Sequence, residues 1–237
     1  MRYHISFDID FRRNPFTGVY IAFEGIDGSG KSTQLDRLKR SFEKAGKKVI
    51  TTSEPKRDFV VGKLIHEVLQ AKIEMPPEAL QYLYSADRAI NHNTVVLPAL
   101  EKGKVVLSHR SFWSVVPYGM HDKGIIDYKN DTSKALLMSQ GLLSMYHQFV
   151  APDVTFFLDI PVEIAMKRLS KMKKVKELYE KKERLKNIAE GYHWLIKQFP
   201  NQFVILDGTQ AEDVITQKIL GELKKRKILC RIRLHLM

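Results

Sequence analysis

The stretch FEGIDGSGKST, from Phe23 to Thr33, decides the fold. It closes the apolar run VYIAF at 19–23 and leads into QLDRLKRSF at 34–42, where the apolar residues have helical spacing. Gly25 to Ser32 fits the pattern G-x-x-x-x-G-K-[ST]. Glycines in this pattern let successive backbone N–H groups point inward as an anion cradle, and the helix adds the positive end of its dipole. The stretch therefore predicts a strand, a phosphate-binding loop and a helix.

This loop is expected to bind a nucleoside triphosphate, which we take to be ATP. Lys31 can reach the β- and γ-phosphates, and the Ser32 hydroxyl can ligate Mg²⁺. Kinases, switch GTPases, motors and ATPases all use such loops. No N-K-x-D guanine-reading motif occurs, which argues against a GTPase switch. The residues expected to surround ATP are Gly25, Ile26, Asp27, Gly28, Ser29, Gly30, Lys31, Ser32 and Thr33.

Four further β-rich runs follow the loop: KVIT at 48–51, KVVLS at 104–108, VTFFLD at 154–159 and FVILD at 203–207. They are nearly continuous in apolar residues, which is typical of strands buried on both faces of a parallel sheet. Patterns of helical spacing separate them, and Gly46 is a stop signal for the first helix. The alternation predicts an α/β fold, with a doubly wound five-stranded parallel sheet flanked by helices.

Length and composition fit one domain. The chain has 237 residues, of which 44% are hydrophobic and 28% charged, enough to bury a core. Residues 1–18 and 228–237 are interpreted as extensions of a domain that spans 19–227. The single cysteine, Cys230, excludes an internal disulfide and fits a reducing compartment, so we expect a cytoplasmic protein. No signal peptide and no apolar run of membrane-spanning length is found, and no membrane partner is expected.

The net charge of +12 does not by itself identify a partner. A basic block, KKRKILCRIR at 224–233, is interpreted as a solvated tail, and nucleic acid is not expected as the main ligand. Arginines in three other stretches are more informative, namely SEPKRD at 53–58, YSADRA at 84–89 and SHRSFWS at 108–114. The first and third follow predicted strands, and ligands of such sheets sit beyond the carboxyl ends of the strands.

Together these motifs resemble the thymidylate kinase family, the P-loop enzymes that phosphorylate dTMP. FEGIDGSGKSTQ, the EP that follows the second strand, LYSADRA, and R-x-x-x-S-x-x-x-Y from Arg110 occur in the family's order and spacing, over about residues 19–225. The resemblance implies a P-loop nucleotide kinase fold with a helical lid. It implies the transfer of a phosphoryl group from ATP to dTMP with Mg²⁺, giving ADP and dTDP for dTTP biosynthesis. It also implies a homodimer.

The resemblance assigns roles around the nucleoside of the acceptor. Asp27 would hold the deoxyribose 3′-hydroxyl, and Tyr84 would stack on the thymine ring, since an aromatic gives planar contact at low entropic cost. Arg88, four residues on, would address the base. Tyr118 would crowd the ribose 2′ position and so favour deoxyribose.

The same resemblance assigns Arg57 and Arg110 to the acceptor phosphate. A guanidinium group can donate a pair of charge-assisted hydrogen bonds to phosphate oxygens. Ser114, one helical turn beyond Arg110, would support that site. Arg110 would also be catalytic together with Lys31, since both would neutralise the migrating phosphoryl group.

The basic segment at about 167–186 carries ten Lys or Arg against three Glu and matches the family's lid. Members of the family carry the catalytic arginine either in the P-loop or in the lid. Since this P-loop lacks an arginine, the resemblance implies that the lid supplies the catalytic cation. Arg168 is the first candidate, with Lys171, Lys173 or Lys174 as substitutes. Arg168 could instead stack on adenine, and the sequence does not separate these two roles.

The chain departs from the family at two positions. It reads His109-Arg110-Ser111 where the family reads Asp-Arg-Tyr, and Gly119 follows Tyr118 where the family has glutamine. Histidine replaces a carboxylate poorly on a hard cation. Either another carboxylate, such as Glu24 or Asp159, compensates, or Mg²⁺ is held mainly by Ser32 and the phosphates.

Two alternatives to dTMP kinase therefore stay open. One is a kinase for another deoxynucleotide or for a nucleoside. The other is a catalytically weak nucleotide-binding protein that uses its basic tail on nucleic acid, where binding would depend steeply on salt.

Overall fold

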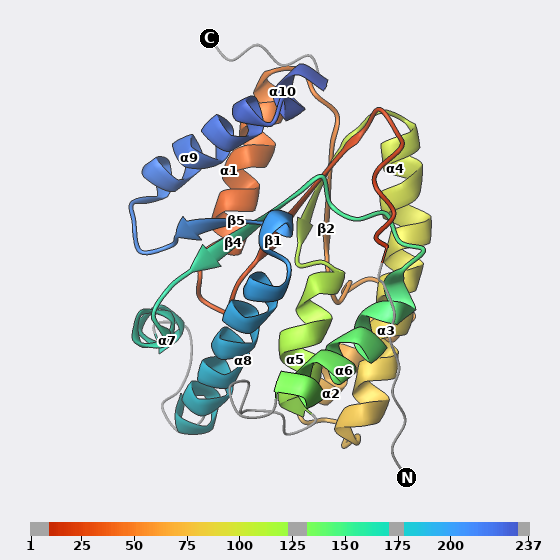
Figure 1. Cartoon of the computed structure of the whole chain (residues 1–237), viewed down its shortest axis with the longest axis vertical. Coiled ribbons are helices and arrows are strands. Elements are labelled where there is room, and N and C mark those ends of the chain that lie inside the picture. The colour runs from red at the N-terminus through yellow and green to blue at the C-terminus, as the bar shows by residue number, and fades with distance from the viewer. Residues whose placement is uncertain (1–9, 123–131, 171–177, 232–237) are drawn as a thin grey trace.

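The computed structural model describes residues 10–122, 132–170 and 178–231. Five strands form one parallel sheet in the order β2-β3-β1-β4-β5 (Figure 1). The strands are β1 (Val19–Glu24), β2 (Val49–Ser53), β3 (Val105–His109), β4 (Val154–Asp159) and β5 (Phe203–Asp207). Each begins at or next to the residue expected from its apolar run, so the predicted α/β fold is confirmed.

Helices connect all the strands within the described residues. Their bounds are α1 (Lys31–Lys44), α2 (Val60–Leu69), α3 (Pro77–Asn91), α4 (Leu97–Glu101), α5 (Val115–Asp122), α6 (Thr132–Leu143), α7 (Val162–Ser170), α8 (Leu178–Gln198), α9 (Glu212–Lys225) and α10 (Ile228–Arg231). A π-helical turn, His92–Val96, joins α3 to α4, and Phe112–Ser114 forms a 3₁₀ turn before α5. α3 begins with a proline at its first position, where the missing N–H costs nothing.

The two faces of the sheet bury different sets of helices, because successive side chains of a strand point to opposite faces. Val19, Ile21 and Phe23 of β1 pack in one apolar cluster with residues of α1, α9 and α10. A second cluster joins α5, α6, α7 and α8 to Phe157 of β4 and Phe203 of β5. Tyr20 points the other way and packs with residues of α4. The sheet is therefore covered on both faces, as expected for a doubly wound fold.

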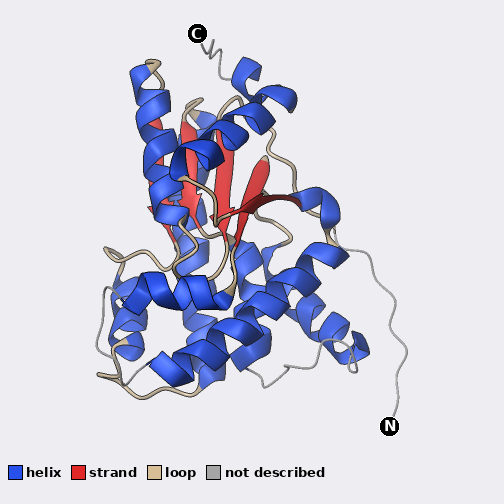
Figure 2. Ribbon diagram, turned by 90° about the vertical axis from the view of Figure 1, so that its left-hand side faces the viewer, coloured by secondary structure: helices blue, strands red, loops and turns tan. Residues whose placement is uncertain are grey.

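The register brings three strand ends to one level. Phe23 of β1 and Ser53 of β2 both pair with His109 of β3. The segments that leave these strands, which carry the P-loop, SEPKRD and SHRSFWS, therefore start side by side. Helices α2, α5, α6 and α8 continue below these carboxyl ends, so one half of the molecule is largely helical (Figures 1 and 2).

Residues at both ends of the described chain pack on the domain. Ile228 and Leu229 of α10 are buried, although they lie beyond the boundary expected at residue 227. Arg231 donates hydrogen bonds to Asp153 at 2.6 Å, to the Gly18 carbonyl at 2.8 Å and to the Phe16 carbonyl. Among the described helices, none is both long and apolar enough to cross a membrane.

Candidate active site

The P-loop folds as its sequence predicts, between β1 and α1. Gly28 and Gly30 have φ of +83° and +101°, a region that favours glycine, and Gly30 is the N-cap of α1. A Cβ added to Gly25 would lie 2.7 Å from the Leu158 carbonyl oxygen of β4. The loop therefore needs glycine both for its backbone turn and for its close approach to the neighbouring strand.

Lys31 is folded back into its own loop. Its ammonium donates to the carbonyl oxygens of Gly25 at 3.0 Å and Ile26 at 2.8 Å, and the residue is 3% exposed. Burial, with Arg110 nearby, lowers the pKa of Lys31 to about 7, while Asp27 and Glu24 oppose this effect. A ligand with several negative charges would reverse that balance, because it would stabilise the charged ammonium.

Arg110 connects the P-loop to the end of β3. It has a positive φ of 75°, uncommon for a residue with a side chain, and this turns it inward directly after the strand. Nη2 donates to Asp27 Oδ1 at 2.8 Å and to the Tyr118 hydroxyl at 2.6 Å, and Nη1 donates to Ser114 Oγ at 3.3 Å. Nη1 also donates to the Gly25 carbonyl at 3.2 Å. The structure thus gathers four of the residues expected at the acceptor site: Asp27, Arg110, Ser114 and Tyr118.

Glu24 lies behind Arg110 and is fully buried. One carboxylate oxygen accepts from the Ser111 backbone N–H at 2.7 Å and its hydroxyl at 2.8 Å. The other accepts from Ser114 Oγ at 2.6 Å and from the Tyr192 hydroxyl at 2.7 Å. Because four donors already occupy this carboxylate, Glu24 is poorly placed to serve as the free metal ligand that the sequence left open.

The Tyr192 hydroxyl was not foreseen from sequence. It lies on α8 and also contacts Ser114 Oγ at 2.8 Å and Arg110 Nη1 at 2.9 Å. Its position in the pattern NIAEGYHWLIKQF, at 187–199, signals a buried helix face but gives no hint of a polar partner.

Arg88 occupies a second buried site, on α3. Its guanidinium donates to Glu54 Oε2 at 2.5 Å and to the Tyr146 hydroxyl at 2.8 Å. Burial raises the pKa of Glu54, and the charge of Arg88 opposes that rise. Tyr84, expected to stack on a base, is half-buried one helical turn earlier on α3. Arg88 and Tyr84 thus share a helix face, as their spacing predicts.

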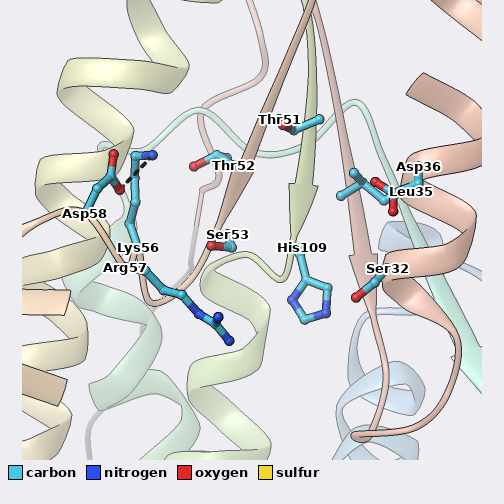
Figure 3. A pocket seen from close by; sticks show the side chains of 10 residues that line it. All are labelled: Ser32, Leu35, Asp36, Thr51, Thr52, Ser53, Lys56, Arg57, Asp58 and His109. Atoms are coloured by element: carbon cyan, nitrogen blue, oxygen red, sulfur yellow. Dashed lines mark ion pairs between the residues drawn. The ribbon is translucent and has the colours of Figure 1, made fainter. Parts of the chain in front are cut away.

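A pocket of about 610 Å³ opens between α1 and the ends of β2 and β3 (Figure 3). It is lined by Ser32, Leu35, Asp36, Thr51, Thr52, Ser53, Lys56, Arg57, Asp58 and His109. Arg57 is exposed and extends into it from the segment after β2, whereas Lys56 is paired with Asp58 at 3.0 Å. Arg57 and Ser32 therefore face the same space from opposite sides.

Arg168, at the end of α7, reaches the other side of the P-loop. It donates to the carbonyl oxygens of Gly28 at 3.2 Å, Ser29 at 3.4 Å and Gly208 at 2.9 Å. The lid candidates Lys171, Lys173 and Lys174 lie outside the described residues, so only Arg168 of that set can be placed.

The donors available to a metal are few. No cluster of three or more His, Cys, Asp or Glu suited to a metal occurs among residues 10–122, 132–170 and 178–231. Asp159 Oδ1 is 3.0 Å from His193 Nε2. Burial, together with Lys31 and Arg110, lowers the pKa of His109 to about 3, so its ring is uncharged at neutral pH. The exposed Ser32 hydroxyl and this neutral imidazole both line the pocket.

Comparisons with known proteins agree with this geometry. The family model described as thymidylate kinase matches residues 23–219. The chain is 37% identical to a thymidylate kinase of Sulfurihydrogenibium sp. (strain YO3AOP1), over 90% of this chain and 100% of that protein. It is 34% identical to a probable thymidylate kinase of Thermococcus gammatolerans, over 83% of this chain and 92% of that protein. It is 32% identical to a thymidylate kinase of Kosmotoga olearia, over 86% of this chain and 94% of that protein. The chain belongs to the thymidylate kinase family.

Proposed function

We propose that this chain transfers the terminal phosphoryl group of ATP to dTMP, giving ADP and dTDP for dTTP synthesis. The observation that carries this proposal is the position of Arg110, which joins both halves of the site. Its guanidinium contacts the Gly25 carbonyl of the P-loop at 3.2 Å and Asp27 at 2.8 Å. A cation at the tip of β3 thus lies directly against the loop that would hold the donor phosphates.

Catalysis would rest on positioning and charge stabilisation, because phosphoryl transfer needs little covalent help from the protein. Lys31 would leave the Gly25 and Ile26 carbonyls and reach the β- and γ-phosphates. Arg110 would exchange part of its contact with Asp27 for an oxygen of the acceptor phosphate. Asp27 would then accept a hydrogen bond from the 3′-hydroxyl of the deoxyribose.

Other side chains would complete the acceptor and donor sites. Arg57, exposed in the pocket, would clamp the acceptor phosphate from the side of β2. Tyr84 and Arg88 would face the base, with Arg88 held in place by Glu54. Tyr118 would stand against the ribose 2′ position. Arg168, already hydrogen-bonded to the P-loop backbone, would be the lid cation.

The residues present fit an Mg²⁺ ion that arrives with ATP. Ser32 has an exposed hydroxyl in the pocket, and the phosphates and water would supply most of the remaining oxygens. When bound, Mg²⁺ would neutralise charge on the β- and γ-phosphate oxygens. Its binding is part of the proposal.

We also propose a homodimer and a cytoplasmic location. Large apolar side chains exposed on α3 and α6, including Ile90, Leu136 and Leu137, are consistent with an interface between two copies. The single described cysteine, Cys230, is free, which fits a reducing compartment.

A panel of acceptors tests the proposed activity. Purified protein with ATP and Mg²⁺ would be offered dTMP, dUMP, dCMP, dGMP, UMP and thymidine, and the ADP formed would be measured. The proposal expects the highest kcat/KM with dTMP. A preference for dCMP or for thymidine would refute it, and so would ATP binding without transfer to any acceptor.

A further inference from the structure

His109 occupies a central position in the pocket. It ends β3, and its register partners are Phe23 of β1, just before the P-loop, and Ser53 of β2. Figure 3 shows its imidazole in the space between Ser53 and Ser32, with the ring turned into the pocket rather than away from it. The ring therefore lies on the same side of the site as the P-loop hydroxyl expected to ligate the metal.

The donors around this point form a mixed set. Ser32 offers a hydroxyl, and Asp36, one turn later on α1, offers a carboxylate to the same pocket. Asp58 lies across the pocket and is held by Lys56 at 3.0 Å. His109 is the lining residue that contributes a ring nitrogen. A cation bound beside Ser32 would thus meet one imidazole and at most one nearby carboxylate from the described lining.

A ring nitrogen does not suit all divalent cations equally. Mg²⁺ is small, prefers oxygen ligands in a strict octahedron and binds imidazole poorly. Mn²⁺ also prefers oxygen ligands, but it is larger, tolerates a less regular geometry and accepts an imidazole nitrogen more readily than Mg²⁺ does. A histidine that lines the pocket beside Ser32 therefore disfavours Mg²⁺ more than Mn²⁺.

We propose that His109 donates a ring nitrogen to the divalent cation bound with the nucleotide, and that this contact shifts the preference of the site from Mg²⁺ towards Mn²⁺. The inference rests on the proposed ATP-binding function. It concerns the identity of the cation, and it does not depend on which nucleotide accepts the phosphoryl group.

The first test is spectroscopic and needs no variant. Protein labelled with ¹⁵N-histidine and unlabelled protein would each be mixed with Mn²⁺ and the non-hydrolysable analogue AMP-PNP. Electron spin echo envelope modulation of Mn²⁺ would then be compared. A directly bound imidazole gives a nitrogen coupling that changes with the isotope. Identical spectra from the two proteins, with Mn²⁺ bound, would overturn the proposal.

Variants then assign the nitrogen. His109→Asn is expected to abolish the coupling. His147→Asn, at an exposed histidine directly after the 3₁₀ turn Ser144–Tyr146 that follows α6, is expected to keep it. If the coupling persists in His109→Asn, another histidine is the ligand and the proposal fails.

Affinity gives an independent measurement. The ratio of the dissociation constants of Mg²⁺–AMP-PNP and Mn²⁺–AMP-PNP would be measured for the wild type, His109→Asp and Asp36→Asn. His109→Asp should shift this ratio in favour of Mg²⁺ by about tenfold, the size of effect typical of changes in metal surroundings. An unchanged ratio in His109→Asp, or a larger shift in Asp36→Asn, would contradict the role of His109.

These outcomes are distinct from a failure of the proposed function. A nitrogen coupling and a shifted ratio, without phosphoryl transfer to any acceptor in the panel, would leave His109 as a cation ligand and refute the kinase assignment. Transfer to dTMP without the nitrogen coupling and without the shifted ratio would support the kinase assignment and refute His109 as a cation ligand.

Discussion

The replacement Tyr192→Phe tests whether the buried network behind Arg110 is as tightly coupled as its geometry indicates. The change keeps the ring and removes a hydroxyl that contacts Glu24 at 2.7 Å, Ser114 at 2.8 Å and Arg110 at 2.9 Å. The residue is 0% exposed, so water cannot easily replace the lost group.

The expected cost follows from these contacts. Glu24 would lose one of its four donors and Arg110 one acceptor, and a hydrogen bond to a charged group contributes about 1.5–3 kcal/mol. Because the serine donors to Glu24 remain, we expect the variant to lose about 2 kcal/mol of unfolding free energy. A chain of this length would then melt roughly 4–8 °C lower.

The same change should act on substrate binding. With Nη1 of Arg110 less constrained, the KM for dTMP should rise about tenfold, the equivalent of 1.4 kcal/mol, while the KM for ATP changes little. Urea denaturation and steady-state kinetics would measure the two effects. Tyr82→Phe is the matched control, because Tyr82 is 70% exposed and its hydroxyl lies at the surface. A loss below about 0.5 kcal/mol for Tyr192→Phe, equal to that of the control, would refute the reasoning.

Four further predictions use single sites. Lys31→Met should abolish turnover. The fold should be kept, because the buried ammonium that the substitution removes carries a desolvation cost. Catalysis by this variant at the wild-type rate would contradict the role of the loop. In the nucleotide-free protein the pKa of Lys31 is about 7 against 10.5 for an unperturbed lysine, so the unfolded chain binds more protons between these pH values. The free energy of unfolding should therefore rise with pH between about 7 and 10.5, by at most about 1.4 kcal/mol per pH unit. Urea titrations would measure this rise in the wild type, and it should be smaller in Lys31→Met. Arg88→Met leaves the Glu54 carboxylate buried without its cation and should cost about 3–5 kcal/mol by chemical denaturation. Arg57→Ala, at an exposed position, should raise the KM for dTMP without a measurable change in melting temperature.

The backbone of this site could be predicted from local patterns. Apolar runs placed the strands, and the spacing of glycines, Lys31 and Ser32 placed a phosphate loop between β1 and α1. Since parallel strands end at one edge, the segments after β2 and β3 could also be assigned to the same edge. The assembly of Asp27 with Arg110 follows from that topology.

The side-chain network could not be predicted in the same way. Glu24 and Tyr192 are 168 positions apart, and a tyrosine on an apolar helix face gives no sequence signal for the partner of its hydroxyl. The left-handed backbone of Arg110 is equally hidden, because turn patterns usually place glycine or asparagine there. Arg88 was expected to address a base, and its burial against Glu54 depends on how α3 packs, which no local pattern records.

The hydrogen bonds of Arg231 have a consequence for how the protein can be trimmed. Asp153 accepts from Arg231 at 2.6 Å, from the Tyr20 backbone N–H at 2.7 Å and from Asn14 at 2.8 Å, so a single carboxylate fastens both ends of the described chain to the start of β1. A shortened version that stops after Arg231 would keep the hydrogen bond to Asp153, whereas one that stops at residue 227 would lose it. Fusion partners are therefore better attached beyond Arg231 than in its place.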